Sequence, residues 1–108
     1  MTTIGRIVDP EPTWTNLAAK DDLEAILSER GKRYGMFKGH AEVTQALKET
    51  MRAHPHHHDL DPDMREALDM IQHKIGRILN GDPEYVGSWD DIAGYAKLVS
   101  DRLKGVSR

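Results

Sequence analysis

Between Asp61 and Gly81, apolar residues recur every three or four positions. They are Met64, Leu68, Ile71, Ile75 and Ile78. This spacing places apolar side chains on one face of an α-helix, because each turn takes 3.6 residues. Both ends are marked: Asp61 can cap, Pro62 suits the first helical position, and Asn80 with Gly81 precedes Pro83. The pattern therefore predicts an amphipathic helix.

Three further segments have helical spacing. The first is expected from about Leu17 to Arg30, with Gly31 as its stop, and the second from about Met36 to Arg52. The last is expected to start with a capping box at Ser88 and to bury Trp89, Ile92, Ala96, Val99 and Leu103. Strands are not expected, because β-branched residues do not alternate and aromatics make up 6%. The predicted fold is an all-α, four-helix antiparallel bundle.

A chain of 108 residues has the size of one domain. Residues 1–16 are expected to form an N-terminal arm, whose Trp14 either docks on the body or a partner or belongs to a lightly ordered tail. Residues 17–108 are expected to form the helical domain. Because so small a core leaves apolar stripes to share, a dimer or larger homo-oligomer is predicted.

Composition excludes several classes of protein. Fifteen Lys and Arg against eighteen Asp and Glu give a net charge of -3, so nucleic acid is not an expected partner. The absence of cysteine excludes disulfides, thiolate zinc sites and a cysteine nucleophile. No apolar run approaches the ~20 residues that span a bilayer, and no signal peptide is evident. A cytoplasmic protein with no membrane partner is therefore expected.

Histidines and a basic link are the first candidates for chemistry. The link from Gly31 to Gly35 suits a turn that faces an anion, or a merely solvated basic turn. His40 lies within the apolar stripe of the second segment and is foremost a candidate core residue. The histidines of residues 54–58 are not predicted to form a metal site, because consecutive loop histidines rarely converge on one ion and no carboxylate is fixed beside them.

The third segment also has a polar face, opposite its apolar stripe. It comprises Glu66, Asp69, Met70, His73, Arg77 and Asn80. Such a face is either solvated and held by weak intrahelical pairs or part of a site. Lys74 lies at the border of the apolar stripe, where its ammonium is expected to enter a groove between helices. Asp91 and Tyr95 occupy the matching border of the fourth segment.

Two short strings resemble the paired acidic motifs of the MazG-like all-α nucleotide pyrophosphohydrolases. They are Glu42-Val-Thr-Gln45 and Glu66-Ala-Leu-Asp69. The resemblance implies that Glu42, Glu66 and Asp69 hold Mg²⁺ against a nucleoside triphosphate, since Mg²⁺ prefers hard oxygen ligands. The chain departs from the pattern at Gln45, where the family has Glu, which removes one negative charge from the implied site.

Longer strings resemble a small family of phage and prophage proteins related to MazG. They are Glu29 to Gly35, Ala67 to Pro83 and Ser88 to Leu98, and the resemblance covers roughly residues 20 to 104. It implies a group of signature positions: Arg33, Tyr34, His73, Lys74, Arg77, Asp91 and Tyr95. Arg and Lys suit phosphate oxygens, whereas Tyr34, Tyr95 or Trp89 suit stacking on a base. Asp91 suits a ribose hydroxyl or an ion pair with Lys74.

Three functions follow as hypotheses. The first is a protein that binds a nucleotide or cyclic nucleotide without turnover and without a cofactor, such as a phage protein that sequesters a signal of host immunity in the host cytosol. The second is a Mg²⁺-dependent nucleoside triphosphate pyrophosphohydrolase, with Asp91 or a water completing the metal shell. The third is a non-catalytic interaction protein, in which Lys74 and Arg77 are satisfied by Asp91 and Glu66.

Overall fold

A computed structural model describes the backbone of residues 17–108 and the side chains from residue 22 onward. The chain divides into two compact units, Met1–Arg30 and Gly31–Arg108. The expected arm, residues 1–16 with Trp14, lies outside the described residues. Among the described helices, none is long and apolar enough to cross a membrane.

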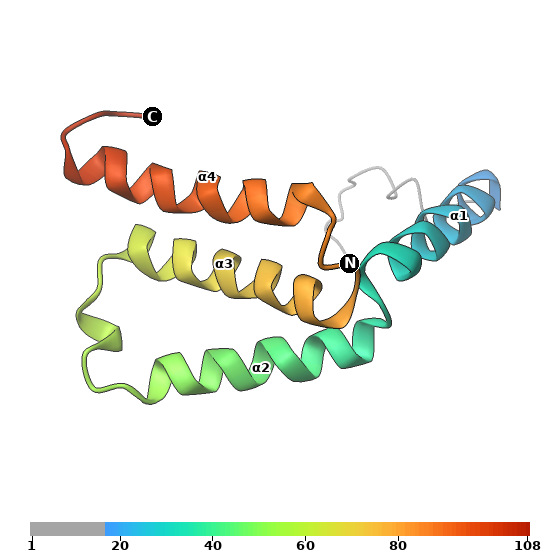
Figure 1. Ribbon diagram of the computed structural model, residues 1–108, viewed down its shortest axis with the longest axis horizontal. Helices are drawn as coiled ribbons and strands as arrows, with labels where there is room; N and C mark the ends of the chain where they lie inside the picture. The colour runs from blue at the N-terminus through green and yellow to red at the C-terminus, as the bar shows by residue number, and fades with distance from the viewer. Residues whose placement is uncertain (1–16) are drawn as a thin grey trace, which may run out of the picture. The chain divides into compact units, whose positions relative to one another are not determined.

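All regular secondary structure in the described residues is helical. Its elements are α1 (Leu17–Tyr34), α2 (Phe37–Ala53), a 3-10 turn η2 (His57–Asp59), α3 (Pro62–Asn80) and α4 (Val86–Leu103) (Figure 1). Residues 17–108 contain no strand. The all-α prediction is confirmed, and so is the number of helices that it expected.

The expected end of the first helix is wrong. Gly31 does not stop α1, which continues to Tyr34. The stop is Gly35, whose φ of 79° is left-handed and whose N–H donates to the Gly31 carbonyl at 2.9 Å. The expected turn of residues 31–35 is therefore mostly the last turn of α1, and its anion-facing loop does not form.

The ends of α3 agree with the sequence, whereas the start of α4 does not. Pro62 is the first residue of α3, and Asn80 is the last. Asp61 makes no side-chain capping bond and instead pairs with Arg102. Helix α4 begins at Val86, so Ser88 lies inside its first turn, buried, and does not cap it.

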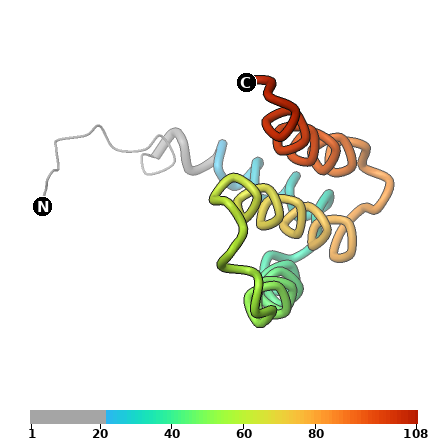
Figure 2. Tube along the Cα trace, turned by 90° about the vertical axis from the view of Figure 1, so that its left-hand side faces the viewer, coloured from blue at the N-terminus to red at the C-terminus, as the bar shows by residue number. Residues whose placement is uncertain are grey.

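Helix α3 lies between α2 and α4 and runs antiparallel to both (Figures 1 and 2). It contacts both neighbours extensively. His40 of α2 reaches His73, and Asp91 of α4 reaches Lys74. The two flanks of α3 therefore carry different contacts, and this division decides which site residues can meet.

The core is thin. Ala67, 7% exposed, is the only apolar side chain that is buried among the described residues. Four residues expected to be buried are exposed: Leu68 of α3, and Trp89, Ala96 and Leu103 of α4. The expectation fails because a helix period identifies an apolar face but not whether this chain supplies anything to cover it.

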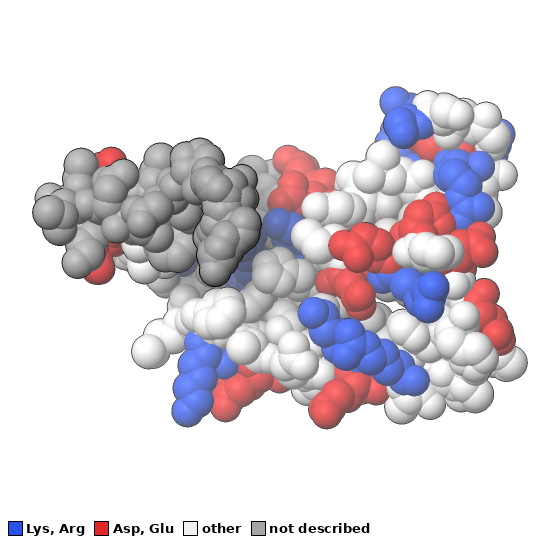
Figure 3. All heavy atoms as spheres, turned by 180° about the vertical axis from the view of Figure 1, so that it is seen from behind, with Lys and Arg blue, Asp and Glu red and all other residues white. Residues whose placement is uncertain are grey.

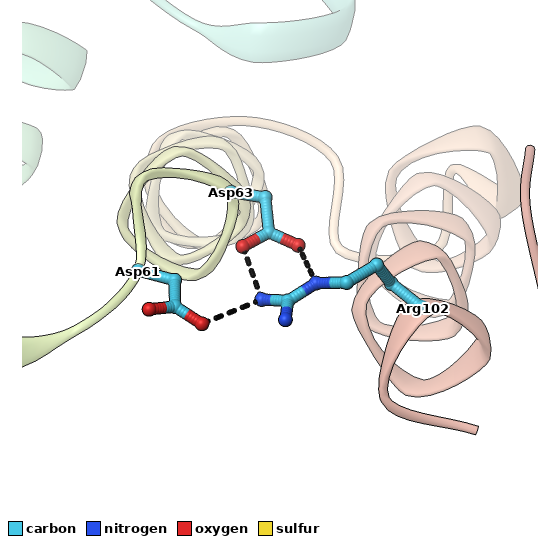
Figure 4. Close-up of polar contacts among 3 residues, drawn as sticks. All are labelled: Asp61, Asp63 and Arg102. Atoms are coloured by element: carbon cyan, nitrogen blue, oxygen red, sulfur yellow. Dashed lines mark hydrogen bonds and ion pairs between the residues drawn. The ribbon is translucent and has the colours of Figure 1, made fainter. Parts of the chain in front are cut away.

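Two ion pairs fix α4 against α3. Lys74 pairs with Asp91 at 2.9 Å, and the Arg102 guanidinium contacts both Asp63 oxygens and, at 2.9 Å, Asp61 (Figure 4). Asp63 precedes Lys74 by eleven residues, and Asp91 precedes Arg102 by eleven, which is about three helical turns in each helix. Because the cation is on α3 in one pair and on α4 in the other, the pairs favour a single antiparallel register.

Candidate functional site

The C-terminal ends of α1 and α3 meet the start of α4 in a tight corner of the second unit. The Asn80 side-chain amide donates to the carbonyls of Tyr34 at 2.9 Å and Met36 at 2.8 Å. The Asp82 N–H donates to the Arg33 carbonyl at 2.7 Å. Gly81 packs so closely on the Arg33–Tyr34 backbone that no Cβ would fit. These contacts hold Arg33 and Tyr34 in fixed positions.

Two guanidinium groups lie over two tyrosine rings at this corner. Arg77 is 4.1 Å from the Tyr34 ring centre, and Arg33 is 4.3 Å from the Tyr85 ring centre. The two rings meet edge to face, with their centres 6.0 Å apart. Stacking leaves the in-plane N–H groups of a guanidinium able to donate to phosphate oxygens. We call these four residues, Arg33, Tyr34, Arg77 and Tyr85, the cationic corner.

The cationic corner unites three of the signature residues. The sequence strings that carry Arg33, Tyr34 and Arg77 are distant in the chain, and the Asn80 and Asp82 hydrogen bonds bring them together. Arg77 makes no ion pair with a carboxylate of residues 22–108, in contrast to Lys74 and Arg102. The predicted pairing of Arg77 with Glu66 is therefore absent from this part of the chain.

His73 pairs with His40 next to the cationic corner. Nε2 of His40 lies 3.3 Å from Nδ1 of His73, and Gly76 gives the His40 ring room against the α3 backbone. Burial, followed by the charges of His40, Arg77, Lys74 and Lys48, lowers the pKa of His73 to about 4. Burial and then Arg77 also lower the pKa of His40. Both imidazoles are therefore neutral at pH 7, which agrees with the interpretation of His40 as a buried core residue.

The stability of the protein is expected to fall as the pH drops from about 6.5 toward 4. Across this window the unfolded state binds the proton of His73 more tightly than the folded state does, so acid favours unfolding. Thermal unfolding followed by circular dichroism at several pH values would measure the slope. We expect His73→Asn to reduce the slope and His58→Asn, at an exposed loop histidine, to leave it unchanged. An identical slope in the His73 variant would contradict this assignment.

Lys74 and Asp91 form a separate pair on the α4 flank of α3. The Lys74 side chain is 11% exposed and that of Asp91 is 51% exposed. The ion pair that the sequence offered as one role for Asp91 is present. Tyr95 lies one turn after Asp91 and is half-buried. The signature residues thus fall into two groups, one at the cationic corner and one between α3 and α4.

The three carboxylates implied as metal ligands do not gather within one chain. Glu42 is exposed and lies two residues from both His40 and Thr44, which are buried against α3. Two residues turn a helix by about 200°, so Glu42 lies on the far side of α2 from Glu66 and Asp69. Among the described residues, no three histidine or acidic side chains are arranged to hold a metal ion. A shared metal site of Glu42, Glu66 and Asp69 is thus not formed within this chain.

The histidine loop does have a carboxylate beside it, contrary to expectation. Asp59 accepts from Nδ1 of His56 at 3.1 Å and lies 3.3 Å from Nε2 of His58. These side chains are exposed and interact with one another. The loop lies at the opposite end of α2 from the cationic corner, and none of the signature positions belongs to it.

A hollow near the end of α4 has a volume of about 490 Å³. It is lined by Leu98, Arg102, Val106 and Arg108, among others. Both guanidinium groups are occupied, that of Arg102 by Asp63 and that of Arg108 by buried Asp101. Arg102 lowers the pKa of Asp63, and Arg108 lowers that of Asp101. No signature residue lines this hollow.

Sequence reasoning missed Tyr85 and the structural role of Asn80. Tyr85 stands in a loop without periodicity, so only its contact with Arg33 reveals it. Asn80 is recognised in sequence as a helix end, a role that does not require its amide to bind two carbonyls of another segment.

On the face shown in Figure 3, basic and acidic side chains are interspersed among the coloured residues, so this face carries no continuous basic surface.

The comparisons with known proteins assign no family. No family model matches the chain, and the searches of curated proteins and of solved structures also find no match.

Proposed function

We propose that this protein binds the phosphate groups of a nucleotide at the cationic corner and releases the ligand unchanged. The observation that carries the proposal is Arg77, which lies over the Tyr34 ring at 4.1 Å without a carboxylate partner among residues 22–108. A guanidinium fixed in this way is prepared for a two-pronged contact with phosphate oxygens, and Arg33 stands beside it on Tyr85. Neutral His73 adds a hydrogen-bonding group at the same place.

Binding without turnover is favoured over hydrolysis by the position of the carboxylates. Mg²⁺-dependent attack on a phosphate requires several oxygen ligands around one ion. Glu42 lies on the far side of α2 from Glu66 and Asp69, whereas the cations lie together at the corner. Protein charge therefore takes the part that Mg²⁺ plays in hydrolases. In this proposal the resemblance to MazG-like enzymes reflects a shared helical framework, and the ligand is a nucleotide signal that the protein sequesters.

Arg77→Met is expected to weaken nucleotide binding at least tenfold. The variant loses charged hydrogen bonds to phosphate, each worth about 1.5–3 kcal/mol, while it keeps an unbranched side chain against Tyr34. Isothermal titration calorimetry with nucleoside triphosphates and cyclic dinucleotides would measure the loss. Arg52→Met, at an exposed arginine near the other end of α2, is the matched control and should bind like the parent.

Chromatography of the same mixtures tests whether the ligand survives. Intact nucleotide recovered after heat denaturation, with and without Mg²⁺, supports binding alone. Mg²⁺-dependent release of pyrophosphate that is lost in Glu66→Ala would replace the proposal with a hydrolase. Equal affinity in the parent and in Arg77→Met would remove the cationic corner from any role in binding.

We also propose that the protein is a homo-oligomer. A single buried apolar side chain is a weak core for the described helices, and large apolar side chains such as Leu79 and Val86 are exposed. A second copy offers the same apolar faces, which a two-fold axis can cover mutually. Sedimentation equilibrium measures the subunit number, and a mass equal to one chain of 12.2 kDa at micromolar concentration would contradict this proposal.

A further inference from the structure

Trp89 is held in one orientation while much of its ring faces solvent. Its indole N–H donates to the Pro83 carbonyl at 2.8 Å, and the residue is 53% exposed. The hydrogen bond satisfies the only polar atom of the side chain, so the exposed part is apolar ring. A large aromatic surface that is fixed and left in water requires an explanation.

The tyrosines of the cationic corner are already occupied. Arg77 covers the Tyr34 ring and Arg33 the Tyr85 ring, and the two rings contact each other by an edge. Gly87 also lies against the Tyr85 ring, where a Cβ would clash. These two rings position guanidinium groups and offer little free surface to a base. Tyr95 is half-buried on the side of α4 that carries Asp91 toward α3.

Tyr85 is the residue just before α4, and Trp89 follows it by four residues, in the first turn of the helix. Side chains four residues apart in a helix have Cβ atoms about 5–6 Å apart. Arg77, Tyr34 and Tyr85 form a continuous series, with successive separations of 4.1 Å and 6.0 Å, and Trp89 bonds to Pro83, two residues before Tyr85. The Arg77 guanidinium and the exposed indole therefore belong to the same end of the unit, where α3 ends and α4 begins.

We infer that Trp89 stacks on the base of the nucleotide whose phosphates bind Arg77. The inference rests on the proposed function and extends it. The cationic corner binds the phosphates, and the indole binds the aromatic base. Stacking tolerates every base, because each has a π-face, so the contact selects nucleotides over inorganic polyphosphate and not one base over another.

The test compares ATP with inorganic triphosphate, using the full chain. The sequence has two tryptophans, so Trp14→Phe leaves Trp89 as the sole source of tryptophan fluorescence. In this background, ATP should change the Trp89 emission and should bind at least about fivefold more tightly than triphosphate, the lower end for base–aromatic stacking. Adding Trp89→Leu should abolish this preference and leave the affinity for triphosphate within about twofold. Leu103→Ala, at an exposed leucine of the same helix, is the matched control.

The outcomes separate this inference from the function on which it rests. If ATP and triphosphate bind equally, or Trp89→Leu keeps the preference while binding still depends on Arg77, only the role of Trp89 is overturned. If Trp89 emission follows protein concentration and ignores ATP, Trp89 belongs to a contact between copies, and the inference is again wrong. If neither probe binds, or binding does not depend on Arg77, the proposed function fails, and the inference fails with it.

Discussion

Replacing Gly81 with alanine is expected to destabilise the protein by about 3 kcal/mol or more, the upper end for forcing extra volume into a packed position. A Cβ at Gly81 would lie well under 3.0 Å from backbone atoms of Arg33 and Tyr34. Backbone cannot move aside as the end of a side chain can, and a shift would also strain the Asp82 to Arg33 hydrogen bond. The midpoint of thermal unfolding should therefore fall by about 10 °C or more.

Gly94→Ala is the matched control for this substitution. Gly94 lies inside α4, and a Cβ there would have no neighbour within 4 Å. Alanine is the better helix former, so this variant should gain about 0.5–1 kcal/mol. Circular dichroism melting curves compare the two variants directly. If Gly81→Ala melts like the parent, the close packing at the corner is not what holds Arg33 and Tyr34 in place.

Reversing the charge of Lys74 is expected to have the second largest effect. Lys74→Glu would place a carboxylate with 11% exposure opposite Asp91, so attraction becomes repulsion in a poorly hydrated place. Because Asp91 is half-exposed, solvent screens part of the effect, and we expect a loss of about 2 kcal/mol. Adding Asp91→Lys should recover most of it, since the swapped pair has the opposite polarity at the same distance.

A double-mutant cycle from urea denaturation measures this coupling. Lys38→Glu reverses an exposed charge on α2 and should have little effect. If the swap does not restore stability, the Lys74–Asp91 pair is incidental and the register of α4 on α3 is set by packing. The pair formed by Arg102 with Asp61 and Asp63 would then be expected to matter equally little.

The sequence predicted the helices well, but it predicted poorly which of their apolar residues are buried. Helix α3 begins at Pro62 and ends at Asn80, before Gly81, as expected, because these residues act on the backbone within a few positions. Gly31 lies inside α1 although the sequence predicts a stop there, because a glycine permits a helix end without imposing one. The helix ends instead before Gly35, whose φ is left-handed. Trp89 and Leu103 fit the apolar face of α4 and are nevertheless exposed.

The candidate site was predicted as a set of residue types and not as an arrangement. Arg33, Tyr34 and Arg77 do meet, but the resemblance that pointed to them gave no reason why they should. Lys74 and Asp91 were expected in the same site and form a pair of their own. Tyr85 was missed, because a tyrosine in an irregular loop carries no pattern of its own.

The local rules of the chain determined the all-helical fold and the limits of α3, because helix periodicity, proline and glycine act over a few neighbouring residues. Only the tertiary structure decided which flank of α3 each charge occupies. It places Arg77 over Tyr34, pairs Lys74 with Asp91 and leaves Glu42 on the side of α2 that faces away from α3. The physical reason is that these outcomes depend on the rotation and register of one helix against another, which are set by contacts such as that of Asn80 with Tyr34, between residues distant in the chain.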